Sequence, residues 1–263
     1  MTEKSTQRNA LWLISIFLLV INLNASLEHP ASAREIKTNE LEIASAPNWL
    51  TESRTQKVID QIERLMEWDI RKIQVIWYQD QAAFESVHGF GPSVLAFARR
   101  SDNTVHVGPR VSAQNFDGIF GHELVHVIVY QKYKDAIPSW LDEGLANYAA
   151  QRINIDYAWL ASQPYRDIRE LTHPFKPVKP ATPADSVNTI SDAETGLPMN
   201  ARYHYMASTA LMQMLASHCD IHDLLQLSVG KKLETYVSTF CEIPDLNSAF
   251  KKWIESKSKS AIK

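Results

Sequence analysis

The chain has 263 residues, of which 45% are hydrophobic and 22% are charged, and its formal net charge is −3. This balance supports a packed globular core. It excludes the strongly basic surface that a nucleic-acid-binding protein presents, so no nucleic-acid partner is expected.

The N-terminus has the three parts of an export signal. Lys4 and Arg8 precede an apolar run from Leu11 to Leu23, and Ala31-Ser32-Ala33 follows as a small-residue cleavage site. The run is shorter than the roughly 20 residues that a membrane-spanning helix needs. We therefore predict a signal peptide over residues 1–33, cleaved near Ala33, and a secreted or periplasmic protein with no stable membrane span after cleavage. An uncleaved anchor is the alternative, and a lipoprotein is not expected because no cysteine follows the run.

Residues 34–69 are predicted to be an N-terminal helical segment. Its helix covers Glu52–Met66, where apolar residues recur at helical spacing. A strand rich in β-branched and aromatic residues is predicted over 73–78, and two shorter strands over 94–99 and 104–107 flank a turn. The 94–99 strand or its partner is our candidate for a sheet edge that pairs with an extended peptide. The alternative is ordinary sheet structure without substrate contact.

The next predicted helix, Phe116–Tyr133, contains the motif H-E-x-x-H. Its histidines, His122 and His126, are four residues apart and therefore lie on the same helical face, where they can bind one Zn²⁺. Glu123 is too constrained to be a third ligand. It is well placed to take a proton from a water molecule at the open coordination position. Because the motif also arises by chance, it needs the support of a third ligand.

A second helix is predicted to begin at Ser139, with Ser139 as its N-cap and acidic residues in its first turn. Glu143 can complete a catalytic His₂Glu zinc site if this helix packs against the first one. The alternative for Glu143 is a solvated acid that interacts with the helix dipole. Asn147, four residues later, can accept the ring N–H of a histidine ligand, or it can be a simple exposed residue.

The segments H-E-L-V-H and P-S-W-L-D-E-G-L-A-N-Y resemble the peptidase MA-like gluzincin zinc metallopeptidases, in which HExxH is followed by W-L-x-E-G. The resemblance covers about residues 70 to 257 and is specific only in the two ligand helices. It implies zinc at His122, His126 and Glu143, with Glu123 as the general base. The chain lacks the G-A-M-E-N-type strand with which related aminopeptidases bind a free amine, so exopeptidase action is not expected.

The resemblance also implies a catalytic tyrosine. A helix of this family often reads Y-x-x-S-x-x-L-x-x-x-L, which Tyr205 begins in this chain. Its hydroxyl can donate to the oxyanion that develops on the scissile carbonyl. Tyr203 and His204 are neighbours that can take that role instead. Simple packing of the aromatic ring against the ligand helices is the competing interpretation.

The remaining chain is divided by a proline-rich loop over 171–200, which is either a lid on the cleft or a disordered insertion. A C-terminal helical subdomain over 201–263 follows, with helices predicted over 203–217, 221–229, 231–239 and 245–254. Cys219 and Cys241, the only two cysteines, either form a disulfide or remain buried thiols.

Other metal-capable residues are assigned no site. His218 and His222 are four residues apart, but one helix ends and another begins between them, so they need not share a face. The other histidines lack ligand spacing: His29, His88, His106 and His173. There is no G-x-S-x-G motif and no phosphate-binding glycine loop, so neither a serine hydrolase nor a nucleotide enzyme is supported.

These patterns together predict an α+β, zincin-like metallopeptidase domain with a small mixed sheet, an HExxH active-site helix and a C-terminal helical subdomain. The zincin-like catalytic core is expected over 70–170. The expected function is zinc-dependent hydrolysis of a protein or peptide substrate, as an endopeptidase. The alternatives are a non-catalytic envelope protein that keeps this fold and binds other proteins, and a hydrolase for a non-protein amide such as a cell-wall peptide crosslink.

Overall fold

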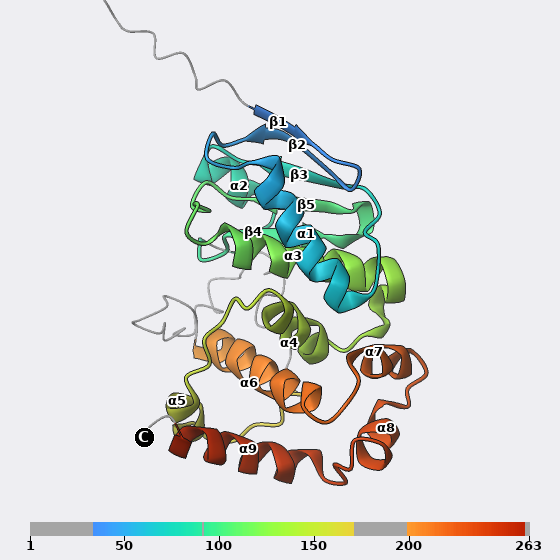
Figure 1. Cartoon of the computed structure of the whole chain (residues 1–263). Coiled ribbons are helices and arrows are strands. Elements are labelled where there is room, and N and C mark those ends of the chain that lie inside the picture. Colours follow the sequence, from blue (N-terminus) through green and yellow to red (C-terminus); the bar gives the residue numbers. More distant parts are fainter. Residues whose placement is uncertain (1–33, 91, 171–198, 261–263) are drawn as a thin grey trace, which may run out of the picture. The chain divides into compact units, whose positions relative to one another are not determined.

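The computed structural model describes residues 34–90, 92–170 and 199–260 (Figure 1). The predicted signal peptide and nearly all of the predicted proline-rich loop lie outside these residues, so both remain predictions. Among the described residues, no helix is both long enough and apolar enough to cross a membrane.

The described chain contains a five-stranded mixed sheet with the order β1-β2-β3-β5-β4. β2 and β5 both run parallel to β3, whereas β1 and β4 pair antiparallel with their neighbours and form the two edges. The strand bounds are Arg34–Lys37 (β1), Leu41–Ala46 (β2), Ile73–Trp77 (β3), Ala96–Arg99 (β4) and Thr104–Val107 (β5). β3, β4 and β5 were predicted, but β1 and β2 were not, so the assignment of 34–69 as a helical segment was wrong in its first part.

Two helices match their predicted bounds, α1 (Glu52–Met66) and α3 (Phe116–Tyr133), and they pack against each other. α3 also contacts β4 and β5 (Figure 1). Alternate residues of β3 are buried, as expected for a strand with one covered face. Phe116 joins the sheet to α3, because its ring stacks on Trp77 with centroids 6.0 Å apart. The HExxH helix is therefore held directly against the sheet.

The other helices lie mainly in the second half of the chain. Their bounds are Gln81–Ser86 (α2), Ser139–Ala149 (α4), Tyr157–Ser162 (α5), Met199–Ala216 (α6), Ile221–Val229 (α7), Leu233–Thr239 (α8) and Leu246–Ser260 (α9), with 3₁₀ turns at Arg100–Asp102 and Lys134–Ala136. α4 packs against both α3 and α6, and α9 packs against α5 and α6. The predicted α+β class with a C-terminal helical region is confirmed.

Cys219, after α6, and Cys241, after α8, form a disulfide. It closes a loop with a sequence separation of 22 residues. In the chain-entropy treatment, such a crosslink stabilises the folded state by about 3 kcal/mol, because it restricts the unfolded chain. Of the two alternatives predicted for these cysteines, the structure therefore has the disulfide and not two free thiols.

Candidate metal centre

α3 places three ionisable side chains in the interior. Every residue from 119 to 129 is buried, so this part of the helix has no solvated face. His122, Glu123 and His126 are between 3% and 8% exposed. Buried ionisable groups are costly unless charges, hydrogen bonds or a metal compensate them, so this arrangement requires partners from neighbouring elements.

Glu143 on α4 is the first of these partners. Its carboxylate oxygens lie 3.5 Å from Nε2 of His122 and 3.6 Å from Nε2 of His126. The side chain is buried, so the alternative of a solvated first-turn acid is wrong. The helix start was also predicted incorrectly: Pro138 is the N-cap residue, and no side chain caps the helix. Ser139 is its first residue, and two N–H groups in its first turn donate to the Pro138 carbonyl instead.

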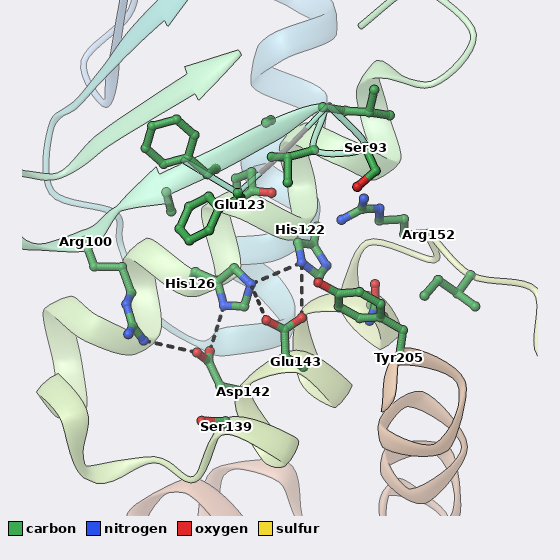
Figure 2. Close-up of a pocket in the computed structure, with 18 of the residues that line it drawn as sticks. Ser93, Arg100, His122, Glu123, His126, Ser139, Asp142, Glu143, Arg152 and Tyr205 are labelled. Carbon is green, nitrogen blue, oxygen red and sulfur yellow. Dashed lines mark hydrogen bonds and ion pairs between the residues drawn. The ribbon is translucent and has the colours of Figure 1, made fainter. Parts of the chain in front are cut away.

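The three candidate ligand residues fit a single metal ion. The two histidine Nε2 atoms lie 3.1 Å apart, and each lies 3.5 to 3.6 Å from a different carboxylate oxygen of Glu143 (Figure 2). One ligand atom from each of the three residues lies within 4.8 Å of the other two. Tetrahedral zinc with ligand bonds of roughly 2.0–2.1 Å requires ligand atoms about 3.3 Å apart. His122, His126 and Glu143 are all buried and can therefore hold a metal ion together.

The charges around the two histidines differ. Burial lowers the pKa of His122 well below its usual value, and the Arg152 guanidinium lowers it further. Burial also acts to lower the pKa of His126, but the carboxylates of Asp142 and Glu143 outweigh it and raise that pKa to about 10. Histidine binds metals as the neutral ring, so metal binding here would displace a proton from His126.

Asp142 orients His126. Its Oδ1 lies 3.0 Å from Nδ1 of His126, on the side of the ring away from Glu143. A carboxylate at this position fixes the ring orientation and leaves Nε2 to the metal. Arg100 pairs with the other oxygen of Asp142 at 3.2 Å, so the positioning chain extends to the residue directly after β4 (Figure 2). This role of Asp142 was not predicted from the sequence, although Asp142 directly precedes a predicted ligand.

Asn147 occupies the corresponding place beside His122. It is 1% exposed, so it is not the exposed helix residue of the alternative interpretation. Its side chain is one of the groups that act to raise the pKa of His122. Neither its side-chain amide nor Nδ1 of His122 makes a hydrogen bond with a described residue, so the role of Asn147 as an outer partner of a histidine ligand stays a prediction.

Glu123 points from α3 toward the edge strand. Burial raises the pKa of its carboxyl group, and Glu143 acts in the same direction. His126, Arg152 and the backbone N–H of Ala98 on β4 act against that rise. A carboxylate with a raised pKa is a stronger proton acceptor, which is the property that a general base needs.

Tyr205 on α6 lines the same cavity as the three candidate ligands. Its ring lies edge-on to His122 with centroids 6.5 Å apart, and its hydroxyl points toward that histidine (Figure 2). The two alternative residues do not line this cavity. The Tyr203 hydroxyl exchanges hydrogen bonds of 3.0 Å with the backbone of Arg166, and His204 is buried elsewhere in the described region.

Gly144 explains how α6 comes close enough to bring Tyr205 to the site. A Cβ atom at Gly144 would lie 2.5 Å from the backbone oxygen of Ser208 on α6, a distance that real Cβ atoms do not reach. Only glycine therefore allows α4 and α6 to pack at this separation. The glycine of the W-L-x-E-G segment is thus a packing requirement adjacent to a candidate ligand.

The cavity in front of the triad has a volume of about 640 Å³ and is called the cleft below. β4 and the loop before it line one side, and the triad and Tyr205 line the other. β4 is an edge strand of the sheet, as predicted for the border of a substrate-binding cleft.

The remaining metal-capable histidines form no second site within the described residues. His218 follows α6 and His222 lies in α7, so they are in different elements, as predicted. His222 bonds instead with the carbonyl of Met66 at 3.0 Å. His106 on β5 bonds through Nδ1 with the Tyr78 hydroxyl at 2.9 Å and stacks on Phe97.

Comparison with known proteins gave no relative: no family model matches the chain, and no curated protein matches its sequence. The buried His122, His126 and Glu143 on two packed helices are consistent with a zincin-like HExxH…E site.

Proposed function

We propose that the chain is a zinc-dependent endopeptidase of the gluzincin type. The observation that carries the proposal is the group of candidate ligands beside the buried carboxyl of Glu123. The two Nε2 atoms lie 3.1 Å apart, and each lies 3.5 to 3.6 Å from an oxygen of Glu143. Two imidazoles and one carboxylate are the ligands of catalytic zinc sites that keep one position open. A bound zinc ion would supply Lewis acidity at the scissile carbonyl.

The chain's own groups would carry the proton and stabilise the charge. Glu123 would accept the proton of the attacking water and pass it to the leaving amine. Tyr205 would donate its hydroxyl to the oxyanion that forms on the scissile carbonyl. Asp142 would keep the His126 ring in its ligand orientation, with Arg100 holding the carboxylate of Asp142.

The cleft and the compartment support a protein substrate outside the cytoplasm. β4 borders the cleft as an edge strand, which offers unpaired backbone groups to an extended peptide. The Cys219–Cys241 disulfide is typical of oxidising compartments and agrees with the signal-like segment at 1–33. A cell-wall peptide crosslink contains the same kind of amide bond and is the second candidate substrate.

A non-catalytic envelope protein with this fold is the alternative from another class. It has no use for a buried, costly carboxyl at Glu123 pointing into the cleft. Intact His122, Glu123, His126 and Glu143 therefore favour the enzyme.

The decisive experiment combines metal analysis with Glu123→Gln. Mature wild type should contain about one zinc per chain and cut members of an unbiased peptide library. Glu123→Gln should keep the zinc and lose hydrolysis by about 10²–10⁴-fold, because an amide cannot accept the proton. Glu255→Gln, the same exchange on the exposed surface of α9, is the control and should behave as wild type. Zinc-free wild type after zinc loading, or an active Glu123→Gln, would refute the proposal.

Tyr205→Phe tests the oxyanion role. It should lower kcat by about 10²–10³-fold with zinc content and KM nearly unchanged, because the donated hydrogen bond acts chiefly in the transition state. Tyr203→Phe is the matched control, since that hydroxyl bonds with backbone outside the cleft. If Tyr205→Phe retains full kcat, the tyrosine only packs against His122.

A further inference from the structure

The two ends of the cleft carry arginines with different partners. At the His126 end, Arg100 is paired with Asp142 at 3.2 Å and with Asp135 at 4.0 Å. At the His122 end, Figure 2 shows the Arg152 guanidinium beside Ser93, above His122 and Tyr205. Arg152 lines the cleft, and its guanidinium makes no hydrogen bond or ion pair with any described residue.

The backbone of Arg152 is fixed by the end of the ligand helix. Gln151 adopts the left-handed conformation with φ of 51°. The N–H of Gln151 donates to the Tyr148 carbonyl at 3.3 Å, and the N–H of Arg152 donates to the Asn147 carbonyl at 3.1 Å. These two bonds form a Schellman motif, which ends α4 in a defined geometry. The helix that provides Glu143 thus also sets the position of Arg152, while its side chain stays exposed to solvent.

The charge of Arg152 acts on the site itself. Burial lowers the pKa of His122 and raises the pKa of Glu123 and of Tyr205, and Arg152 acts to lower all three, so the guanidinium lies within electrostatic range of these groups. Arg202, which also lines the cleft, contacts Asp156 at 3.6 Å and lies over the Trp159 ring at 4.2 Å. The positive charge that faces the cleft at this end therefore comes mainly from Arg152.

We propose that Arg152 binds a carboxylate of the substrate, so that the cleft prefers peptides with a negative charge close to the scissile bond. A guanidinium presents two parallel N–H donors that match the two oxygens of a carboxylate. In a peptide this carboxylate is either an Asp or Glu side chain or the free C-terminus. The inference rests on the proposed peptidase function and adds its substrate class.

The test uses three short alanine–serine peptides of the same length. The first carries one Glu and an amidated C-terminus, the second has Gln in place of Glu, and the third has Gln and a free C-terminal carboxylate. The position of the Glu or Gln is scanned along the chain. A preference for the first peptide over the second identifies side-chain recognition, whereas a preference for the third identifies the C-terminus. Equal kcat/KM for all three peptides at every scanned position would overturn the inference.

Arg152→Gln should lower the ratio of kcat/KM between the preferred charged peptide and its neutral counterpart by about 10- to 100-fold, the range of a charge-assisted hydrogen bond. Arg152→Lys should restore part of this ratio, since it keeps the charge but loses the planar fork. The control is Arg64→Gln, which removes the same charge from the exposed surface of α1 outside the cleft. If Arg152→Gln lowers kcat/KM equally for charged and neutral peptides, Arg152 acts on the catalytic groups and the inference is wrong.

Binding separates this inference from the proposed function. Fluorescein-labelled versions of the three peptides are titrated into zinc-loaded Glu123→Gln, with and without Arg152→Gln. A charge preference that depends on Arg152 supports the inference even if wild type cuts none of the peptides, in which case only the function fails. Hydrolysis by wild type without any charge preference in binding or in kcat/KM overturns the inference and leaves the function standing.

Discussion

α1 and α3 pack against each other, yet they bury their residues in different ways. α1 buries a stripe at helical spacing, Thr55, Val58, Ile59, Ile62 and Met66, and leaves its charged side chains fully or partly exposed. α3 is buried from residue 119 to 129 and includes two histidines and a glutamate in that stretch. The polar residues of α1 are stable because they are solvated. Those of α3 depend on α4, which supplies Asp142, Glu143 and Asn147 around them.

The difference shows which parts of a helix a sequence can predict. Periodicity predicts the bounds and the buried face of α1, since transfer of apolar groups from water is what forms that face. The same argument predicts that α3 is a helix, but it does not explain why ionisable groups are tolerated inside it. These ionisable side chains are stable in the interior because of partners more than a dozen residues away in the sequence and, by our proposal, because of a metal ion.

The largest expected effect of any substitution is loss of the metal from α3. His126→Ala removes one of three ligands and leaves Glu143 with a single histidine partner, so the purified protein should lose its stoichiometric zinc. Elemental analysis and a zinc titration measure this. His218→Ala, an exposed histidine after α6, is the control and should bind zinc as wild type does. Retention of one tightly bound zinc by His126→Ala would place the ligand set elsewhere.

On α1 the corresponding substitution should affect stability alone. Ile62 is fully buried, and Ile62→Ala should lower the free energy of unfolding by about 2–5 kcal/mol through lost burial and the cavity that remains. Zinc stoichiometry of the folded protein should stay the same. Urea unfolding of the zinc-loaded protein measures the first quantity and elemental analysis the second. A loss of zinc comparable with that of His126→Ala would show that the site depends on α1 packing and would break the comparison.

His106 shows what a buried histidine costs without a metal role. Burial lowers its pKa to about 4, compared with about 6.5 in the unfolded chain. The unfolded state therefore binds more protons between these values, so acidification favours unfolding. The contribution of His106 should be fully present above pH about 6.5 and should fall by about 3 kcal/mol as pH drops to about 4. Urea unfolding of His106→Phe across this window should show a correspondingly weaker pH dependence than wild type, with His218→Ala as control. An unchanged pH dependence would contradict this assignment.

The smallest expected effect concerns the outer partners of the histidines. Asp142→Asn should weaken zinc binding by about 10- to 100-fold, because the amide orients the His126 ring less well than a carboxylate. Arg100→Gln should act in the same direction and less strongly, since Arg100 touches the site only through Asp142. Competition titration with a zinc chelator measures the zinc affinity of both variants and of wild type. If Asp142→Asn binds zinc as tightly as wild type, the 3.0 Å contact does not position the ring.

The sequence predicted α1, α3, β3 and β5 within one residue, because each has a strong hydrophobic pattern. β1 and β2 were missed since Glu, Lys and Ser interrupt their short apolar alternation. The strand state of β2 depends on pairing with β3, and that of β1 depends on pairing with β2. H-E-x-x-H and Glu143 were found from local spacing and resemblance. The Arg100–Asp142 pair joins residues 42 positions apart, and only the tertiary fold brings them together.

Gly144 makes the metal site depend on how closely α4 and α6 pack. Its backbone contact with Ser208 and the carboxylate of Glu143 belong to adjacent residues on one rigid helix. A descendant chain could therefore keep every ligand and still lose the site through one added methyl group, because relief of the clash would shift α4 as a unit. Zinc affinity measured on folded Gly144→Ala would show this directly, as a loss of binding in a protein whose ligand residues are all intact.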